Sequence, residues 1–223
     1  MTRSTTPVRS SLLDLLDPYA PTFATLWTGL LANAPQEAPL RVAFTSCEHG
    51  DGTTTAAACA AISLALHGGR EVVLVEANAH RPGLAELLGL PAGPGLEEVR
   101  SGEVALESAV RETDLPGLRV LTVGVPKVTS VPPRAAELSR IWQNLAGENC
   151  HLIVDAPPAP AHPQTVPILA SLDGVILVLN ARRTKRGDVR PVLRSLDSAG
   201  IPLLGTLLNR CTRGLPAWLR PPR

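Results

Sequence analysis

Short apolar runs recur along the chain from residue 40 onward, and longer stretches with helical spacing separate them. The runs lie at 40–46, 71–76, 118–123, 151–155, 173–179 and 203–208. They are rich in Val, Ile and Leu and nearly continuous in apolar character, which is typical of parallel strands covered on both faces. We therefore predict that each run is a strand of one sheet.

The stretches between these runs have the composition and spacing of helices. Residues 53–67 are Ala-rich and apolar almost all round, which predicts a helix buried against the sheet. Residues 133–146 and 185–199 carry apolar residues at three- and four-residue spacing, as a helix with one buried face does. The alternation of strands and helices predicts an α/β fold, a doubly wound, mostly parallel sheet with helices on both faces.

The ends of the chain differ in pattern from its middle. We expect an N-terminal arm and helix over 1–38, with a loosely docked arm over 1–20, a helix over 21–33 and a linker over 34–39. The main domain is expected over 39–212 and a Pro/Arg-rich tail over 213–223. No apolar run reaches the roughly 18 residues of a membrane span, so we expect a cytoplasmic protein.

Composition narrows the range of partners. The formal net charge is +1 and aromatic residues make up only 3% of the chain. A near-neutral protein has no overall field that attracts nucleic acid, and few aromatic residues are available to stack on bases. We therefore expect no nucleic-acid partner.

The most informative segment is 42–55, where an apolar strand leads into a Gly-rich loop and then into the Ala-rich helix. This is the layout of a P-loop, G-x-x-x-x-G-K-[ST], in which backbone N–H groups and a helix N-terminus hold phosphates. The candidate nucleotide-binding residues are Gly50, Asp51, Gly52, Thr53, Thr54 and Thr55. Thr54 stands at the hydroxyl position that holds Mg²⁺, whereas Thr53 stands at the lysine position. The sequence therefore keeps the Gly-rich loop that would bind phosphates and lacks the lysine that would supply the positive charge.

Two further strands end in a carboxylate. Glu76 closes the run 71–76, and Asp155 closes 151–155 and is followed by Pro157 and Pro158. An apolar strand that ends in an acidic residue is the Walker B pattern, in which the carboxylate binds a metal directly or through water. Because ligands of such sheets bind beyond the carboxyl ends of the strands, Thr54, Glu76 and Asp155 are candidate Mg²⁺ ligands.

Six motifs occur in an order that resembles a known family. They are TSCEHGDGTTT from residue 45, VLVEANAHRP from 73, GLEEVRSG from 95, PPRAAEL from 132, IVDAPP from 153 and GTLLN from 205. Over residues 21–210 the chain is similar to ParA/MinD-like deviant P-loop proteins, and most of all to the cytoplasmic domain of bacterial tyrosine kinases (BY-kinases) of capsule and exopolysaccharide export. The resemblance implies ATP and Mg²⁺ as cofactors, a base contact from Asn209, and a membrane chain-length or export protein as partner.

The chain departs from the family pattern at the site itself. Thr53 replaces the P-loop lysine, Glu76 and Asn78 replace two aspartates, and His80 replaces the first of two arginines, while Arg81 keeps the second. A charge-assisted bond contributes about 1.5–3 kcal/mol, and more where charge develops in a transition state. We therefore expect weak ATP and Mg²⁺ binding.

Assembly features of the family are also lost. The Glu-x-x-Arg-x-x-Arg motif that drives ring assembly in the family falls on Pro21, Ala24 and Trp27, so no ring is expected. The tyrosine cluster that the family phosphorylates is absent, because Tyr19 is the only tyrosine of the chain.

These losses favour a non-catalytic regulatory or binding module of polysaccharide synthesis or export, placed at the inner face of the plasma membrane by its partner. The alternatives are an active ATP-dependent tyrosine kinase or ATPase with an unusual loop, and a ParA/MinD-type positioning ATPase. An active site would need another cation, and Arg81 is the one candidate that the sequence offers. The basic stretch 182–186 is interpreted as a solvated loop or as a contact for a partner or an anionic leaflet. His49, His80 and His151 lie near the edges of the predicted site, and we assign them no catalytic role.

Overall fold

The computed structural model describes residues 8–33, 39–125, 132–147, 149–159, 162 and 164–211. The predicted tail over 213–223 and most of the predicted linker over 34–39 lie outside these residues. None of the helices in the described part of the chain has the length and apolar character needed to span a bilayer.

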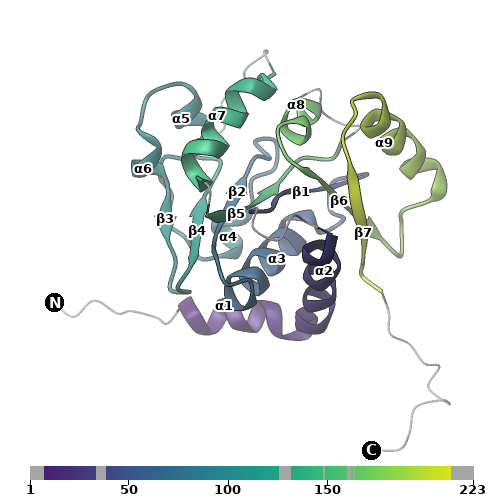
Figure 1. The fold of residues 1–223 in the computed structure, drawn as a ribbon, viewed down its shortest axis with the longest axis horizontal. Helices are drawn as coiled ribbons and strands as arrows, with labels where there is room; N and C mark the ends of the chain where they lie inside the picture. The colour runs from purple at the N-terminus through teal and green to yellow at the C-terminus, as the bar shows by residue number, and fades with distance from the viewer. Residues whose placement is uncertain are drawn as a thin grey trace, which may run out of the picture.

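A seven-stranded sheet forms the centre of the molecule, with strand order β3-β4-β2-β5-β1-β6-β7 (Figure 1). The strands are β1 (Arg41–Ser46), β2 (Glu71–Glu76), β3 (Arg111–Glu112), β4 (Leu118–Leu121), β5 (Cys150–Asp155), β6 (Gly174–Asn180) and β7 (Leu203–Asn209). All pairs are parallel except β3 with β4, which is antiparallel. The predicted doubly wound, mostly parallel α/β sheet is confirmed, and β3 is the strand that the apolar pattern missed.

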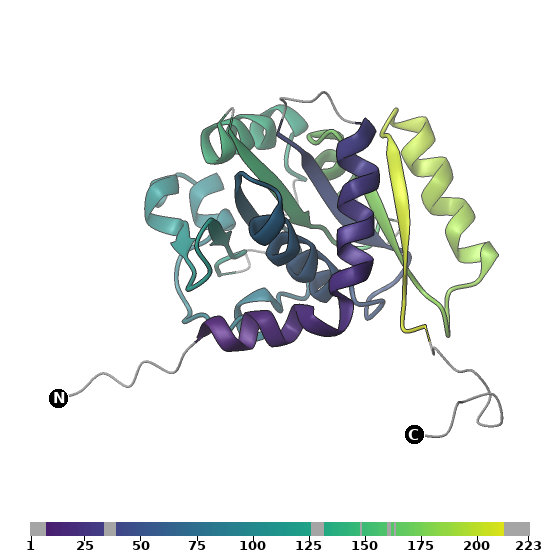
Figure 2. The same ribbon diagram turned by 60° about the horizontal axis from the view of Figure 1, so that its bottom comes forward.

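Helices cover both faces of the sheet (Figures 1 and 2). They are α1 (Val8–Leu16), the 3₁₀ helix η1 (Asp17–Tyr19), α2 (Ala20–Asn33), α3 (Thr53–His67), α4 (Leu84–Leu87), α5 (Leu96–Arg100), α6 (Leu106–Ala109), α7 (Ala135–Ala146), α8 (Thr165–Ala170) and α9 (Arg186–Ser198). The long helices match the predicted ones, whereas α4, α5, α6 and α8 are too short to show helical periodicity.

Each face of the sheet has its own hydrophobic core because side chains alternate along a strand. Val42 and Phe44 of β1 pack toward α1, α2, α3 and α4, while Ala43 packs toward α5, α7, α8 and α9. The helix α3 is buried along residues 56–64, as its all-round apolar pattern predicts. Its small side chains let the helix lie close to the sheet.

The N-terminal segment is more ordered than the pattern suggested. Residues 8–19, expected as part of a loose arm, form α1 and η1, and Leu12 and Leu16 are buried in the core on the α3 side. Trp27 of α2 is also buried, and its indole Nε1–H donates to the Ala60 carbonyl of α3 at 3.2 Å. The apolar patch of 12–16 spans one helical turn, so it gains burial only when α3 supplies the opposing surface.

Candidate functional site

The Gly-rich loop lies between the carboxyl end of β1 and the start of α3. Gly50 has φ +82° and Gly52 has φ +90°, values that only glycine adopts at low cost. Gly52 is the N-cap residue, and Thr53 is the first residue of α3. The loop therefore leads through two left-handed glycines into a helix N-terminus, a position at which backbone N–H groups can bind an anion.

Asn209 reaches this loop from the end of β7. Its side-chain amide donates to the Asp51 carbonyl oxygen at 2.8 Å. A Cβ atom at position 52 would collide with the same amide nitrogen, so Gly52 is required both by its backbone conformation and by this close approach. The structure thus brings Asn209 to the loop residues with which the sequence analysis grouped it.

Asp155 closes β5 beside the start of α3, and its side chain is 1% exposed. Neither carboxylate oxygen has a hydrogen-bond partner among the described residues. Burial raises the pKa of Asp155 to about 7; the charge of Glu76 adds to the increase, and the neighbouring Thr54 hydroxyl opposes it. A buried carboxylate that lacks partners and lies beside a hydroxyl is suited to a hard cation such as Mg²⁺, which prefers oxygen ligands. The pair Thr54 and Asp155 therefore fits the predicted metal.

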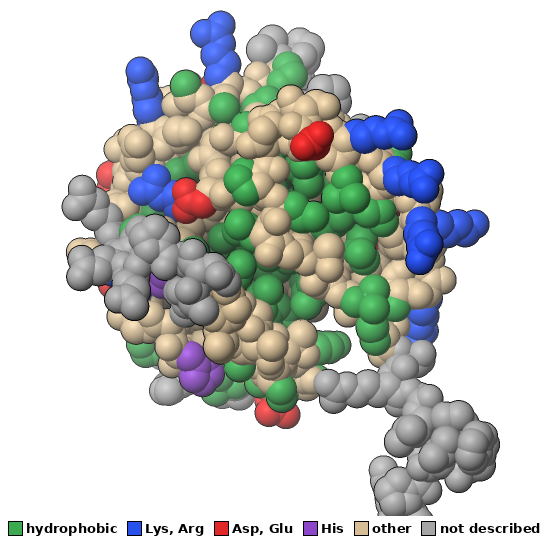
Figure 3. All heavy atoms as spheres, turned by 45° about the vertical axis from the view of Figure 1, so that its right-hand side comes forward, with side chains coloured by type: hydrophobic (Ala, Val, Ile, Leu, Met, Phe, Trp, Pro, Cys, Tyr) green, Lys and Arg blue, Asp and Glu red, His purple; other side chains and the backbone are tan. Residues whose placement is uncertain are grey.

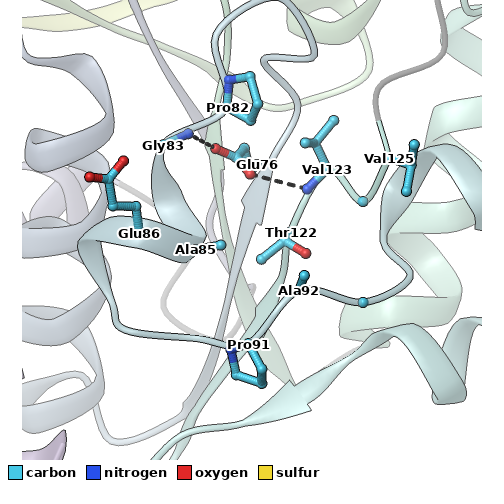
Figure 4. A pocket seen from close by; sticks show the side chains of 12 residues that line it. Glu76, Pro82, Gly83, Ala85, Glu86, Pro91, Ala92, Thr122, Val123 and Val125 are labelled. Atoms are coloured by element: carbon cyan, nitrogen blue, oxygen red, sulfur yellow. Dashed lines mark hydrogen bonds between the residues drawn. The ribbon is translucent and has the colours of Figure 1, made fainter.

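Glu76 is paired in register with Asp155, but its carboxylate is bound elsewhere. One oxygen accepts the N–H groups of Gly83 at 2.6 Å and Leu84 at 2.8 Å, and the other accepts that of Val123 at 3.2 Å. Figure 4 shows two of these bonds, with Glu76 on the wall of a cavity of about 270 Å³. The carboxylate joins the loop after β2 to the end of β4, and these three bonds occupy most of its capacity as an acceptor.

Arg183 is a residue of the site that the sequence analysis missed. It lies in the turn between β6 and α9, and its Nη2 donates to Asp51 Oδ1 at 2.7 Å and to the His49 carbonyl at 2.7 Å. Its Nε lies 3.4 Å from Glu48 Oε2. The hydrogen bond to Asp51 raises the pKa of the guanidinium. Part of the basic stretch 182–186 thus faces the P-loop rather than solvent alone, and no local pattern predicts a contact across 132 residues.

Three histidine side chains, one of them from the Gly-rich loop, lie in contact with one another. His49 Nε2 and His162 Nε2 lie 2.9 Å apart, and the ring of His80 stacks on His162 with centroids 3.8 Å apart. Burial lowers the pKa of both His49 and His162; the charges of Arg81 and His80 add to the effect at His49, and those of His80 and His49 at His162. Among the described residues no group of three or more His, Cys, Asp or Glu side chains could hold a metal ion. His151 lies elsewhere, at the amino end of β5, where its Nδ1 accepts the Leu40 N–H.

A cavity of about 630 Å³ lies beside the loop, between η1, α2, α3 and β7. Its walls include Gly52 and Thr55 on one side, Tyr19 and Phe23 on a second, and Asn209 on a third. The edge strand β7 exposes apolar side chains, among them Leu203, Leu204 and Leu208. Figure 3 shows hydrophobic side chains across the middle of this view, several Lys and Arg side chains at its right edge, and others at the top and left.

The fold and this loop define a class: a P-loop protein of the ParA/MinD type. No family model matches the chain. It is 30% identical over 174 residues to the tyrosine-protein kinase YwqD of Bacillus subtilis (strain 168), a match that covers 75% of this chain and 71% of YwqD. The chain belongs to the family of bacterial tyrosine-protein kinases.

Other relatives and solved structures agree. The chain is 27% identical over 146 residues to the tyrosine-protein kinase Ptk of Acinetobacter johnsonii, but it spans only about 20% of that protein's length. The kinase domain of VpsO superposes with a TM-score of 0.76 at 28% identity, covering 89% of this chain and 98% of that one. MinD of Pyrococcus horikoshii OT3, solved with Mg-ADP, gives a TM-score of 0.64 at 25% identity, covering 79% of this chain and 72% of that one.

Proposed function

We propose that this chain is a non-catalytic regulatory or binding module, related to the tyrosine autokinases of capsule and exopolysaccharide synthesis or export. One observation carries the proposal. Residue 53, at the N-terminus of α3 where the P-loop formula has lysine, is a threonine, and Arg183, a cation that reaches the loop, is bound to the Asp51 carboxylate and the His49 carbonyl. A moving phosphoryl group would lack the positive charge that stabilises it in the transition state.

The metal half of the site keeps two of the three ligands that the sequence predicts. Of the two carboxylates that the sequence assigns to Mg²⁺, Glu76 is held by backbone N–H groups, which leaves Asp155 with Thr54. Thr54 and Asp155 would hold Mg²⁺, whose charge would offset that of the phosphates, and a displacement of about an ångström would cost roughly a hundredfold in rate. The pair that remains is the hydroxyl and carboxylate combination that holds Mg²⁺ in P-loop proteins, so the case against catalysis rests on residue 53.

We further propose that the loop keeps a weak affinity for a nucleotide. The residues Gly50, Asp51, Gly52, Thr53, Thr54 and Thr55 would surround the phosphates, and Asn209 would contact the base. The left-handed conformations of Gly50 and Gly52 and the unpaired carboxylate of Asp155 support a retained anion and cation site. When bound, Mg²⁺ would neutralise phosphate charge, and this chain's residues would only orient the ligand.

The setting of the module is proposed by family relationship. Its partner would be a membrane protein of polysaccharide chain-length control or export, at the inner face of the plasma membrane. Within the chain, the arm and helix over 1–38, the P-loop domain over 39–212 and the tail over 213–223 remain the predicted division. The partner would bind the P-loop domain and respond to its conformation. It would not be phosphorylated by it.

ATP turnover by the purified protein with Mg²⁺ tests the proposal. We expect the rate to equal that of Asp155→Ala, because no catalytic step depends on the metal site. A turnover that Asp155→Ala abolishes would overturn the proposal.

The same result would establish the second candidate, an active ATPase or tyrosine kinase with an unusual site. One observation favours this candidate: Arg183 provides a positive charge at the loop that the sequence alone does not place there.

A further inference from the structure

Arg183 makes its contacts on the segment that forms the P-loop. One nitrogen, Nη2, joins the His49 carbonyl and the Asp51 carboxylate, and it lies 3.9 Å from where a Cβ on Gly50 would be. The other oxygen of Asp51 accepts the Glu48 N–H at 3.1 Å. Asp51 therefore closes the loop on itself, and Arg183 fixes that closure from the β6–α9 turn.

The negative charges of the loop explain why the contact between Arg183 and Asp51 stabilises it. Asp51 is 1% exposed and Glu48 lies in the same loop, so the segment that should hold an anion carries two carboxylates of its own. A buried carboxylate without a cationic partner is unfavourable, and like charges repel an incoming phosphate. With threonine at residue 53, positive charge has to come from outside the loop, and Arg183 provides it.

Asn209 fixes the same residue from a different strand. Its amide donates to the Asp51 carbonyl, while Arg183 binds the Asp51 side chain. The main chain and the side chain of Asp51 are thus both held by residues that follow β6 or end β7. The loop conformation depends on these two contacts from distant parts of the chain.

We propose that Arg183 is a positioning residue of the P-loop: it holds the loop in its anion-binding conformation and neutralises Asp51, so that affinity for a nucleoside diphosphate depends on residue 183. The role is carried out through Asp51 and not by contact with the phosphates. Only the part of this proposal that concerns nucleotide affinity rests on the proposed function, in which the loop retains a nucleotide site. The conformational part stands on the contacts themselves.

The matched control is its neighbour Arg182, which is exposed in the same turn and carries the same charge. Four variants are compared with the unaltered protein: Arg183→Ala, Arg183→Lys, Arg182→Ala, and Arg183→Ala combined with Asp51→Asn. Asparagine at 51 keeps an oxygen for the Glu48 N–H but carries no charge. Mg-ADP affinity is measured by calorimetry well below the melting temperature, and hydrogen exchange of the amides of 50–55 is measured without nucleotide.

We expect Arg183→Ala to weaken Mg-ADP binding by about tenfold, as the loss of one charge-assisted contact would, and Arg182→Ala to change it by less than about twofold. The Mg-ADP affinity of Arg183→Lys should lie between that of Arg183→Ala and that of the unaltered protein. Lysine keeps the positive charge but does not reproduce the way in which the guanidinium binds two acceptors. The double variant should recover affinity, a charge-specific rescue that a general packing defect would not show. Exchange at 50–55 should accelerate in Arg183→Ala and stay unchanged in Arg182→Ala.

Two results separate this proposal from the proposed function. If the unaltered protein binds no Mg-ADP, the retained nucleotide site fails, and the exchange rates alone decide the role of Arg183. If Arg183→Ala behaves like Arg182→Ala in both measurements, Arg183 has no positioning role and the inference is overturned.

Discussion

The side chain of Asn209 donates a hydrogen bond to the Asp51 carbonyl at 2.8 Å and so ties the end of β7 to the P-loop across 158 residues of chain. The contact is possible because Gly52 has no side chain, since a Cβ atom there would collide with the Asn209 amide. A glycine of the loop and an asparagine of the last strand are therefore a matched pair, and each constrains what the other position can hold.

Gly52→Ala should destabilise the fold and weaken any ligand binding at the loop. Its φ of +90° costs a residue with a Cβ about 1–2 kcal/mol, and the Asn209 amide must also move. We expect a total loss of about 2 kcal/mol in the free energy of unfolding, measured by urea denaturation. Gly187→Ala in α9, where the added Cβ meets no atom within 4 Å, is the control and should be neutral or stabilising. Equal stability of the two variants would contradict this account of the loop.

Thr53→Lys should restore the cation at the start of α3. A charge-assisted contact of about 1.5–3 kcal/mol corresponds to a gain of about ten- to a hundredfold in Mg-ADP affinity. Calorimetry on the variant and on Thr53→Ser, which keeps a hydroxyl and adds no charge, separates the effect of charge from that of size. No gain in Thr53→Lys would mean that the loop no longer presents its amides to a phosphate.

Asp155→Asn should stabilise the metal-free protein at high pH. The raised pKa of Asp155 means that its contribution to stability is full below the ordinary value of 3.8 and is lost as the pH rises through about 7. Each pKa unit corresponds to about 1.4 kcal/mol, so removing the ionisable group should raise the melting temperature by several degrees at pH 8 and by little at pH 4. Calorimetric melting in the presence of EDTA measures the effect. An unchanged difference between the two pH values would show that the carboxylate is not isolated.

His151 should make the protein less stable in mild acid. Burial lowers its pKa to about 4; the charge of Arg70 adds to the effect, and a hydrogen-bond interaction in which the Gly68 backbone accepts from the ring opposes it. The neutral ring therefore stabilises the fold fully above pH 6.5, and that contribution is lost as the pH falls toward 4. The full loss is on the order of 3 kcal/mol.

The measurement for His151 is the slope of unfolding free energy between pH 6.5 and 4. In His151→Leu this slope should differ from that of the unaltered protein by the missing histidine contribution, although Leu40 loses its acceptor at every pH. Asp155 acts in the opposite direction in the same range, so only the difference between the two proteins is informative. Parallel slopes would rule out the buried neutral histidine.

Trp27→Arg should unfold the N-terminal helices rather than restore ring assembly. Trp27 occupies the position of an arginine in the family's assembly motif, yet it is 4% exposed and its indole is bonded to Ala60. An unpaired cation at this site should cost about 3 kcal/mol or more. Ala24→Arg, at an exposed position of the same helix, is the control and should have little effect. Urea denaturation and sedimentation measure both properties, and a stable ring of Trp27→Arg protein would contradict the prediction.

The sequence alone determined the layered α/β fold, the long helices and the loop. Each of these depends on local physical rules: apolar runs of strand length, the period of 3.6 residues, and glycines where φ must be positive. The sequence also placed Thr54, at the start of the helix that follows the first strand, near Asp155 at the end of another strand, because parallel strands present their carboxyl ends at one edge of the sheet. These features need no knowledge of which side chains meet.

Only the tertiary structure decided which partners the charged and titratable side chains of the site bind. It directs Glu76 onto the backbone of Gly83 and Val123, brings Arg183 to Asp51, and joins His49 to His162. It also packs α1 on α3 through Leu12 and Leu16 and adds the short antiparallel strand β3. Such contacts join segments far apart in the chain, and their partners follow from the paths of loops and crossovers, which local periodicity does not encode.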